Sequence, residues 1–546
     1  MPDSASRPRV TIRQGTIVGA RSDRNHGKSP QVLDEFLGIP YALSTAGERR
    51  FRPPVPVGAS NGEFDAGQYG YRCPAGDADE TPLGEDCLNL NIYRPGIQYG
   101  RAKLPVLVHI HGGSFNFGAG NNRQISSFVA WSKKPFIGIS FNYRLGAFGF
   151  LSSKLMGKEG LLNVGLKDQQ LLLQWVKDNI AAFGGDPDDV TIMGSSAGAH
   201  SVGHHLLNNP DKPPLFHKAI IESGGATARA VRPYDNSLFE TQFQEFISHA
   251  GLLDVPSDKL IDQLRALPWS KIKAASETIY GKYDTSVRWP FQPVIDGEGG
   301  IIPIAPIKAW QAGKWHQVPI LTGFNTNEGA IFIEPTISTS AQFTSFFATL
   351  LPTFSPDDLE ALGKVYPDPI THPSSPYTET RKNIGLGAQF FRTEQAYGHY
   401  AYIAPVRQTA RFASKGPAPV YLYHYAVTGR KDGGADHGDH NDFVTYSQEI
   451  RNVSPSVMEI SANMHAYWTS FITTGDPNTE GGLAKERPTW PKYDYAQGVG
   501  KVALFGEGND ELASGNQKGV VVKIVDDLWA KEECQFWMER TGLSEI

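Results

Sequence analysis

Residues 190–198 read Val-Thr-Ile-Met-Gly-Ser-Ser-Ala-Gly, an apolar run followed by five small residues. The apolar run predicts a buried strand, and the small residues from Gly194 to Gly198 predict a sharp turn into a helix. Such a turn holds the central Ser196 in a strained backbone conformation, and the flanking glycines let strand and helix approach closely. Ser196 therefore projects its hydroxyl group outward and is the candidate nucleophile. Small residues also form ordinary tight turns, so this assignment depends on the rest of the chain.

Similar apolar runs lie on both sides of this turn in the sequence. Residues 104–110 and 136–141 form two of them, and each is followed by glycine or other turn-forming residues. Residues 165–183 carry apolar side chains at helical spacing. Strand, helix and strand in alternation imply right-handed parallel crossovers, and hence an α/β fold whose sheet is covered on both faces. Runs at 318–322 and 420–425 continue this sheet.

The chain has 546 residues, which exceeds the usual size of a domain. The strand signals nevertheless span most of the sequence, and no linker interrupts them, so we expect one large domain, 1–546. Helical patterns lie between the sheet elements, at 237–252, 257–267 and 342–351. We expect them to belong to insertions, at about 230–290 and 335–415, that cover the strand ends and shape a substrate pocket.

The composition is that of an ordinary globular protein, with 40% hydrophobic and 20% charged residues. The formal net charge is -6, and Lys and Arg are scattered, so no surface for nucleic acid is indicated. The first ten residues lack the apolar core of a secretory signal, and no later run could span a bilayer. We therefore expect a small-molecule substrate, no nucleic acid, no membrane anchor, and a monomer or a homodimer.

Three cysteines, Cys73, Cys87 and Cys534, are too few for a disulfide scaffold and too widely spaced for a zinc site. Cys73 and Cys87 could still pair, and a bridge would favour an oxidising compartment. The missing signal and the single glycosylation sequon, at Asn452, favour a compartment that is not oxidising. Localisation stays open: cytoplasmic for the chain as written, secreted if a signal was removed.

Residues 111–115 read His-Gly-Gly-Ser-Phe and directly follow a predicted strand. Glycines at this place let backbone N–H groups approach a developing oxyanion. The expected donors are Gly113, Ser114 and Ala197, each worth about 3 kcal/mol of transition-state stabilisation. A phosphate-binding loop is the alternative, but no Lys-Ser or Lys-Thr pair follows and the spacing does not match a dinucleotide fingerprint.

Several other short motifs occur along the chain. They are Arg-Phe at 50–51, Glu-Asp-Cys-Leu-Asn-Leu-Asn at 85–91, Asn-Tyr-Arg at 142–144, Gly-Leu-Lys-Asp-Gln at 165–169, Phe-Gly-Gly-Asp-Pro at 183–187 and Phe-Gln-Pro-Val-Ile-Asp-Gly at 291–297. Together with the Ser196 turn, they make the chain resemble the type-B carboxylesterases, which include cholinesterases, carboxylesterases and inactive adhesion proteins. The resemblance implies the α/β-hydrolase fold: a central, mostly parallel twisted sheet flanked by helices, with helical insertions over the active site.

The resemblance also implies the two partners that a nucleophilic serine needs. The family's acid falls on Glu328, within Gly-Phe-Asn-Thr-Asn-Glu-Gly at 323–329, and its histidine falls on His437. The order serine, acid, histidine is the one expected for this fold. His440 lies three residues further along the same loop and remains the alternative base.

A metal site is a competing interpretation of this loop, because His437, Asp439, His440 and Asp442 are close in sequence. All four lie on one Gly-rich loop, and no second cluster of ligands occurs elsewhere in the chain. We therefore expect neither a metal nor a cofactor.

Other residues receive supporting roles from the resemblance. Arg50 with Glu85, and Arg144 with Asp168, resemble buried structural ion pairs, whose loss should destabilise the fold. Large aromatic residues could line an apolar substrate pocket, and the candidates are Phe115, Phe291 and Phe332.

The chain also departs from the family pattern. Ser195 stands where most members have glutamate, and Ser114 replaces a glycine. Residues 74–86 contain no aromatic residue that could stack on a quaternary ammonium, so cholinesterase activity is disfavoured. The same segment is short and acidic, with Asp77, Asp79 and Glu80 among its residues, so we expect no broad lipid-contacting lid.

Together, these features predict a serine carboxylesterase that hydrolyses esters of small to medium apolar substrates through an acyl-enzyme. The same triad could serve a lactonase, a thioesterase, an amidase or an acyltransferase, because pocket shape decides the leaving group. A non-catalytic binding protein is the alternative outside enzymes, but such relatives lack an intact triad.

Overall fold

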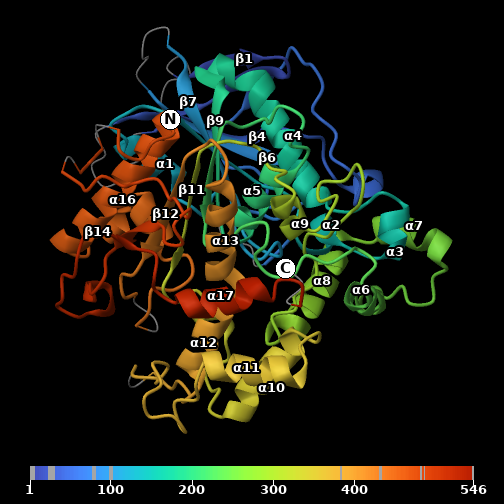
Figure 1. The fold of residues 1–546 in the computed structure, drawn as a ribbon. Coiled ribbons are helices and arrows are strands. Elements are labelled where there is room, and N and C mark those ends of the chain that lie inside the picture. Colours follow the sequence, from blue (N-terminus) through green and yellow to red (C-terminus); the bar gives the residue numbers. More distant parts are fainter. Residues whose placement is uncertain are drawn as a thin grey trace.

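In the residues that the structure describes, eleven strands form one twisted sheet through the middle of the molecule (Figure 1). This computed structural model describes residues 7–22, 31–76, 81–96, 102–381, 384–429, 433–479, 482–484 and 486–543. The strand order is β14-β13-β12-β11-β10-β9-β7-β8-β6-β4-β3. From β8 to β13 all neighbours pair in parallel, whereas β14 at one edge and β6, β4 and β3 at the other pair antiparallel with their neighbours.

The strands of this sheet have the following bounds: β3 Ala20–Ser22, β4 Leu33–Pro40, β6 Asn89–Pro95, β7 Leu104–Ile110, β8 Ile137–Phe141, β9 Gly185–Ser195, β10 Lys218–Glu222, β11 Ile320–Asn325, β12 Val420–Tyr425, β13 Lys501–Phe505 and β14 Val522–Asp526. A smaller sheet contains β1 Arg9–Ile12, β2 Gly15–Val18 and β5 Glu63–Asp65. The predicted strands at 104–110 and 420–425 are confirmed at both ends. The predicted α/β class with a mostly parallel sheet is therefore correct.

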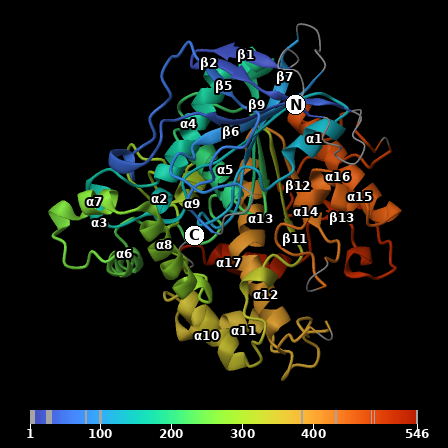
Figure 2. The ribbon, with the colours of Figure 1, turned by 180° about the vertical axis from the view of Figure 1, so that it is seen from behind.

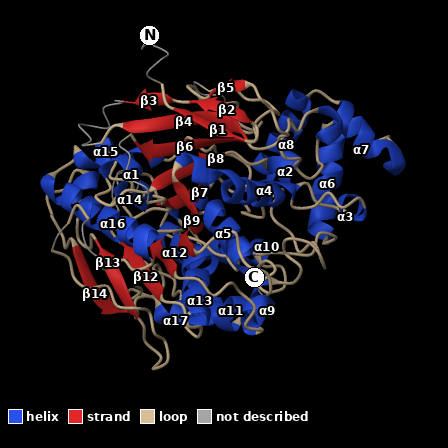
Figure 3. Ribbon diagram, turned by 90° about the horizontal axis from the view of Figure 1, so that it is seen from above, coloured by secondary structure: helices blue, strands red, loops and turns tan. Residues whose placement is uncertain are grey.

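Both faces of the sheet are apolar because its central strands are buried on both sides. Along β7, Val106 and Val108 belong to one core cluster, and Leu107, between them, belongs to the other. Side chains alternate between the two faces of a strand, so a strand that is covered on both faces needs a nearly continuous apolar run. Figure 3 shows helices on both sides of the strands that supply this cover. The uninterrupted pattern of 104–110 follows from this burial.

The helices fill the connections between strands. They are α1 Ile125–Trp131, α2 Gly146–Phe150, α3 Lys154–Lys158, α4 Val164–Asn179, α5 Ala197–Leu207, α6 Ser237–His249, α7 Ser257–Ala266, α8 Trp269–Asp284, α9 Pro306–Gln311, α10 Ser340–Leu350, α11 Pro356–Val365, α12 Phe390–Gly398, α13 Ala404–Ala413, α14 His440–Val444, α15 Gln448–Arg451, α16 Pro455–Thr474 and α17 Lys531–Glu539. A π-helical segment, His399–Ile403, joins α12 to α13. Figure 3 places α4 and α5 on one side of the sheet, and α1 and α16 on the other.

Two long excursions separate neighbouring strands. One connects β10 to β11 and contains α6, α7 and α8; the other connects β11 to β12 and contains α10, α11, α12 and α13. Figures 1 and 2 show α10 and α11, drawn in yellow, at the end of the molecule opposite β1. The helical patterns predicted at 237–252, 257–267 and 342–351 correspond to α6, α7 and α10, each within a few residues. No helix within the described residues combines the length and the apolarity needed to cross a membrane.

Cys73 and Cys87 form a disulfide, and Cys534 is a buried free thiol. The pairing that the sequence left open is therefore present. The expectation about a lid rested on Asp77, Asp79, Glu80, Glu85 and Asp86; the first three lie outside the described residues, so it stays a prediction.

The two ion pairs expected from the sequence are present and buried. Arg144 binds Asp168 through two side-chain hydrogen bonds, Nε to Oδ2 at 2.8 Å and Nη2 to Oδ1 at 2.6 Å. Arg50 binds Glu85 in the same two-pronged way, at 2.6 and 2.7 Å. The remaining Nη1 of Arg50 donates to the carbonyl oxygens at the end of α7, including that of Leu264 at 2.9 Å. This arginine thereby caps a helix of the first excursion.

We expect Asp168→Asn to lower the free energy of unfolding by about 3–5 kcal/mol, because it leaves the buried Arg144 guanidinium without a counter-charge. Urea titration followed by fluorescence measures this loss, while activity per folded molecule is retained. Glu360→Gln removes the exposed ion pair with Lys364 and serves as the control, with no shift of the transition expected. An Asp168→Asn protein as stable as the unmodified one would contradict a structural role for this pair.

Candidate active site

The turn at Ser196 joins β9 directly to α5. Ser196 has φ 58° and ψ -126°, a conformation that costs a non-glycine residue free energy and that recurs at functional sites. A Cβ on Gly198 would lie 2.1 Å from the carbonyl oxygen of Ile110, and one on Gly194 would lie 2.3 Å from the carbonyl carbon of Gly198. Both glycines are therefore required for the close approach of β9, α5 and β7. The Ser196 side chain sits at the amino end of α5, where it is only half-buried.

The stretch after β7 lies against this turn. A Cβ on Gly112 would lie 2.8 Å from the carbonyl oxygen of Ser195. Gly113 has φ 110° and Ser114 has φ 54°, so the chain doubles back beside Ser196. The carbonyl oxygen of Gly113 accepts from the Phe117 N–H at 2.9 Å, and that of Ser114 accepts from the Asn116 and Gln292 side chains, both at 2.8 Å.

The N–H groups of Gly113, Ser114 and Ala197 have no hydrogen-bond acceptor within the part of the chain that the structure describes. Ala197 is the first residue of α5, so its N–H also lies at the positive end of the helix dipole. Unsatisfied donors beside a serine hydroxyl form a site suited to an anionic oxygen.

Glu328 and His437 meet although 109 residues separate them. The Nδ1 atom of His437 lies 2.5 Å from Oε2 of Glu328, and the other carboxylate oxygen accepts from the Asn325 N–H at 2.7 Å. Glu328 is fully buried and His437 is almost so. The histidine ring packs against Phe332, with 5.3 Å between centroids, and against Tyr402, at 4.4 Å.

Two asparagines hold the loop of His437 to the loop of Glu328. Asn327 donates its N–H to the carbonyl oxygen of Ala435 and accepts from the Ala435 N–H, both at 2.9 Å. The side chain of Asn325 donates to the carbonyl oxygen of Asp436 at 2.6 Å. Asn327 is itself held by Glu394, whose carboxyl accepts from its amide at 2.8 Å. Burial raises the pKa of Glu394 to about 8, so this carboxyl is mostly neutral at pH 7.

A cavity of about 400 Å³ brings the separate parts together. Ser196 and His437 both line it, as do Gly113 and Ser114. The Nε2 atom of His437 is buried and, among the described residues, has no hydrogen-bond partner. Apolar side chains at the cavity are those of Phe117, Ile331 and Phe332.

His440, the alternative base, lies in a different contact. It begins α14, is fully buried, and its Nε2 atom lies 3.8 Å from Oε2 of Glu222, too far for a hydrogen bond. Glu222 also accepts from Arg123 at 2.6 Å and from the Trp468 indole at 2.8 Å. Burial disfavours the charged form of Glu222, but Arg123 and His440 outweigh it and hold the pKa at about 2. Thus Glu328 has His437 as its neighbour, and Glu222 has His440.

Of the three phenylalanines expected at a substrate pocket, one lines the cavity and two do not. Phe332 lines the cavity at Ser196. Phe115 is 1% exposed and packs against Phe150, and Phe291 is 4% exposed and packs against Phe246. These two therefore belong to the core close to the cavity.

Sequence reasoning missed the tyrosines around the candidate base. Tyr402 lies in the π-helical segment after α12, and Tyr397 lies in α12; both rings contact Phe332. A π-helical turn has no clear sequence signature, although it recurs at functional sites. Only the aromatic composition of residues 397–402 signalled a buried segment.

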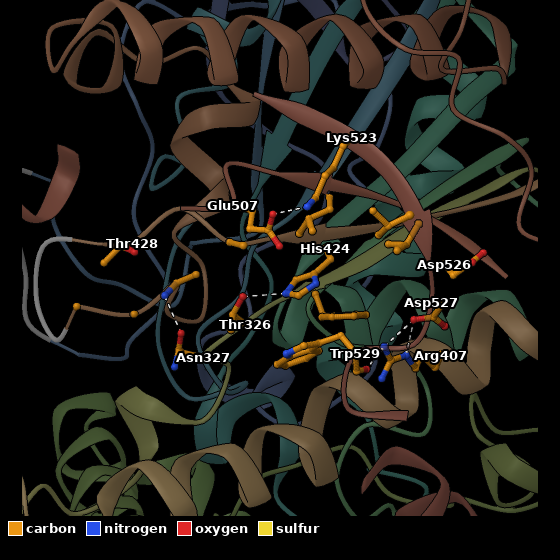
Figure 4. A pocket seen from close by; sticks show the side chains of 18 residues that line it. Thr326, Asn327, Arg407, His424, Thr428, Glu507, Lys523, Asp526, Asp527 and Trp529 are labelled. Carbon is orange, nitrogen blue, oxygen red and sulfur yellow. Dashed lines mark hydrogen bonds and ion pairs between the residues drawn. The ribbon is translucent and has the colours of Figure 1, made fainter. Parts of the chain in front are cut away.

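Figure 4 shows a second cavity, whose lining includes Thr326 and Asn327, next to Glu328, and residues 433–435 of the His437 loop. Its volume is about 430 Å³. His424 and Trp529 face it, and His424 Nε2 is hydrogen-bonded to the Thr326 hydroxyl at 2.8 Å. Its charged side chains are paired with one another or with a neighbour: Lys523 with Glu507, Arg407 with Asp527, and Asp526 with Lys501. Neither Ser196 nor His437 lines this cavity. In the residues that the structure describes, no three His, Cys, Asp or Glu side chains converge to hold a metal.

The chain resembles proteins of one family over almost its whole length. A model of the carboxylesterase family matches residues 6–537. The secreted lipase 4 of Gibberella zeae is 34% identical over 520 residues, covering 93% of this chain and 89% of that protein. The lipase 4 of Diutina rugosa is 33% identical, with coverage of 90% and 91%.

Solved structures share the architecture. The crystal structure of Aspergillus niger EstA superposes with a TM-score of 0.83 and 26% identity, covering all of both chains. A structure titled PNB esterase superposes with a TM-score of 0.77 and 25% identity, covering 97% of this chain and 99% of that one.

Proposed function

This chain belongs to the carboxylesterase family, and from this premise we propose that Ser196, His437 and Glu328 form the catalytic triad of a carboxylic ester hydrolase with the α/β-hydrolase fold. The observation that carries the proposal is the contact between His437 and Glu328, which leaves the Nε2 atom of His437 without a partner in the cavity that Ser196 also lines. A triad requires that relation between base, acid and nucleophile.

In the proposed reaction, His437 takes the proton of the Ser196 hydroxyl as the serine oxygen bonds to the ester carbonyl carbon. The carbonyl electron pair moves to the oxygen and forms a tetrahedral oxyanion. As that intermediate collapses, the bond to the alcohol breaks and His437 returns the proton to the departing oxygen. Water then attacks the acyl-enzyme by the same route, which releases the carboxylic acid and restores Ser196.

The oxyanion would be held by the N–H groups of Gly113, Ser114 and Ala197. Each such donor is worth about 3 kcal/mol when it is fixed before the reaction begins. The hydrogen bonds to the carbonyl oxygens of Gly113 and Ser114 support that fixed geometry. Glu328 would hold His437 in the tautomer whose Nε2 accepts a proton, and would stabilise the imidazolium that then forms.

The substrates that we propose are esters of small to medium size with apolar groups, because Phe117, Ile331 and Phe332 line the cavity. Lipase activity is the second candidate, because the relatives in Gibberella zeae and Diutina rugosa are named lipases. It would use the same chemistry on a longer acyl chain. We also propose that the chain acts as one catalytic domain, with the excursions at about 230–290 and 335–415 covering the pocket.

Covalent labelling tests the proposed nucleophile. A fluorophosphonate probe should phosphonylate the folded protein on one residue, and peptide mass spectrometry should locate the adduct on Ser196. Heat-denatured protein should not react, because an isolated serine hydroxyl is a weak nucleophile. A folded protein that stays unlabelled, or that carries the adduct on another serine, would refute the assignment.

A further inference from the structure

An arginine occupies the loop that separates the two halves of the proposed triad. Strand β10 lies between β9, which leads to Ser196, and β11, which leads to Glu328. The loop that follows β10 carries Arg229 at the same edge of the sheet, where the carboxyl ends of parallel strands build binding sites. Arg229 has φ 60°, an unfavourable conformation for arginine that the surrounding structure must enforce.

The positive charge of Arg229 is buried without a negative partner. The residue is 9% exposed, and the contacts that its guanidinium makes within the described residues are with an aromatic ring and an amide, not with a carboxylate. It lies over the ring of Trp289, 4.5 Å from the centroid, and donates one hydrogen bond, to Gln292 Oε1 at 3.3 Å. The ring face and one amide compensate the guanidinium only in part, and the Asp284 carboxylate, which accepts from the Trp289 indole at 2.8 Å, makes no ion pair with it. An anion beside it would complete the site.

A small pocket adjoins this guanidinium. Its volume is about 30 Å³, room for about two water-sized groups, which suits the two oxygens of a carboxylate. Arg229, Arg232 and Arg288 are among the residues that line it. Two-pronged hydrogen bonding to a carboxylate is the interaction for which the guanidinium geometry is suited.

Two contacts link the lining of the arginine pocket to the lining of the cavity at Ser196. Gln292 lines the pocket and donates to the carbonyl oxygen of Ser114, which lines the cavity, at 2.8 Å. On another side, Trp289 of the pocket packs against Phe332 of the cavity, with ring centroids 5.4 Å apart. The charge of Arg229 also acts on His200, whose pKa is lowered first by burial and second by this arginine. The backbone N–H of His200 donates to the carbonyl oxygen of Ser196 at 3.0 Å.

We propose that Arg229 binds a carboxylate carried by the ester substrate, so that the enzyme favours esters with an anionic group, such as half-esters of dicarboxylic acids, over neutral esters of the same length. This inference rests on the proposed function of Ser196. It names a substrate class that an apolar cavity alone would not select, because desolvating an unpaired carboxylate there would be costly.

Matched substrates test the proposal at constant ionic strength. Mono-p-nitrophenyl glutarate is compared with its neutral methyl ester, which places the charge on the acyl half. 4-Carboxyphenyl butyrate is compared with its methyl ester, which places it on the alcohol half. In Arg229→Gln we expect kcat/KM for at least one anionic ester to fall by about 10- to 100-fold, the loss that follows removal of a charged hydrogen bond. The values for the neutral esters should change by less than about threefold.

Two variants serve as comparisons. Arg229→Lys keeps the charge but loses the two-pronged geometry, and should show an intermediate loss. Arg451 lies over Trp131 at the same 4.5 Å distance, so Arg451→Gln removes a similar ring contact elsewhere and should leave the preference unchanged. Thermal midpoints verify that each variant is folded. If Arg229→Gln does not fold, the decision rests on Arg229→Lys and on competitive inhibition of the unmodified enzyme by free glutarate.

The outcomes distinguish a carboxylate carried by the ester substrate from a free anion in solution. Equal ratios of anionic to neutral kcat/KM in the unmodified enzyme and in Arg229→Gln overturn the proposal. It is also overturned if chloride or free glutarate binds in an Arg229-dependent way while no anionic ester is favoured, because the pocket then takes a free anion. Hydrolysis of neutral esters that Ser196→Ala abolishes would uphold Ser196 as the nucleophile in either case, so the two hypotheses can fail separately.

Discussion

Ser196→Ala is expected to reduce kcat for p-nitrophenyl butyrate by about a million-fold, because it removes the hydroxyl that we propose as the nucleophile. The residual rate would come from the oxyanion donors and from binding alone. The fold should remain intact, since the side chain is half-buried and no side-chain hydrogen bond of Ser196 contributes to the packing in the described residues. Full activity in this variant would end the hypothesis.

Ser196→Gly provides a sharper control on the same residue. It should be as inactive as the alanine variant, but more stable than that variant by about 1 kcal/mol, because glycine adopts the observed φ of 58° without strain. Urea denaturation of the two inactive proteins measures the difference. Equal stability would mean that the turn does not store strain at this residue.

The second prediction compares the two histidines of one loop. His437→Asn should lower kcat by about 10,000-fold or more, because asparagine cannot take up the serine proton, which is the role proposed for His437. His440→Asn should lower it by less than about tenfold, equivalent to about 1.4 kcal/mol, because His440 lies beside Glu222 and not Glu328.

Stability should change in the opposite order. His440 is fully buried beside Glu222, which Arg123 and Trp468 also contact. The His440→Asn variant is therefore expected to have a lower melting temperature than the His437→Asn variant. Steady-state kinetics and calorimetry on the same preparations distinguish the two roles. A larger loss of kcat in His440→Asn than in His437→Asn would reverse the assignment of the base.

The sequence predicted the centre of the sheet better than its edges. Strands β7 and β12 are buried on both faces, so their apolar runs are continuous and their ends are sharp. Strand β9 is longer than the run at 190–193, because it begins at Gly185 with polar residues that the pattern does not mark. The antiparallel pairing of β6, β4 and β3 could not be predicted, since β4 mixes Asp and Glu with apolar residues and its direction depends on contacts with distant strands.

The residues of the candidate site also differ in how well the sequence predicts them. Ser196 and the glycines around it could be identified locally, because a sharp turn between strand and helix restricts both residue type and spacing. Glu328 and His437 required the family resemblance, because nothing in their own surroundings marks a contact across 109 residues. The lining of the cavity was the least predictable part: Phe115 and Phe332 are the same residue type, and only their packing in three dimensions decides which of them reaches the cavity.

The paired asparagines that tie the loop of His437 to that of Glu328 have a mechanical consequence. Because Asn325 and Asn327 bond to the backbone of residues 435–436, the loops of His437 and Glu328 form one cross-linked unit. No comparable bond joins that unit to the hydroxyl across the cavity in the described residues. Movement of this unit relative to Ser196 would therefore change the gap between His437 and the serine hydroxyl without breaking the contact between His437 and Glu328.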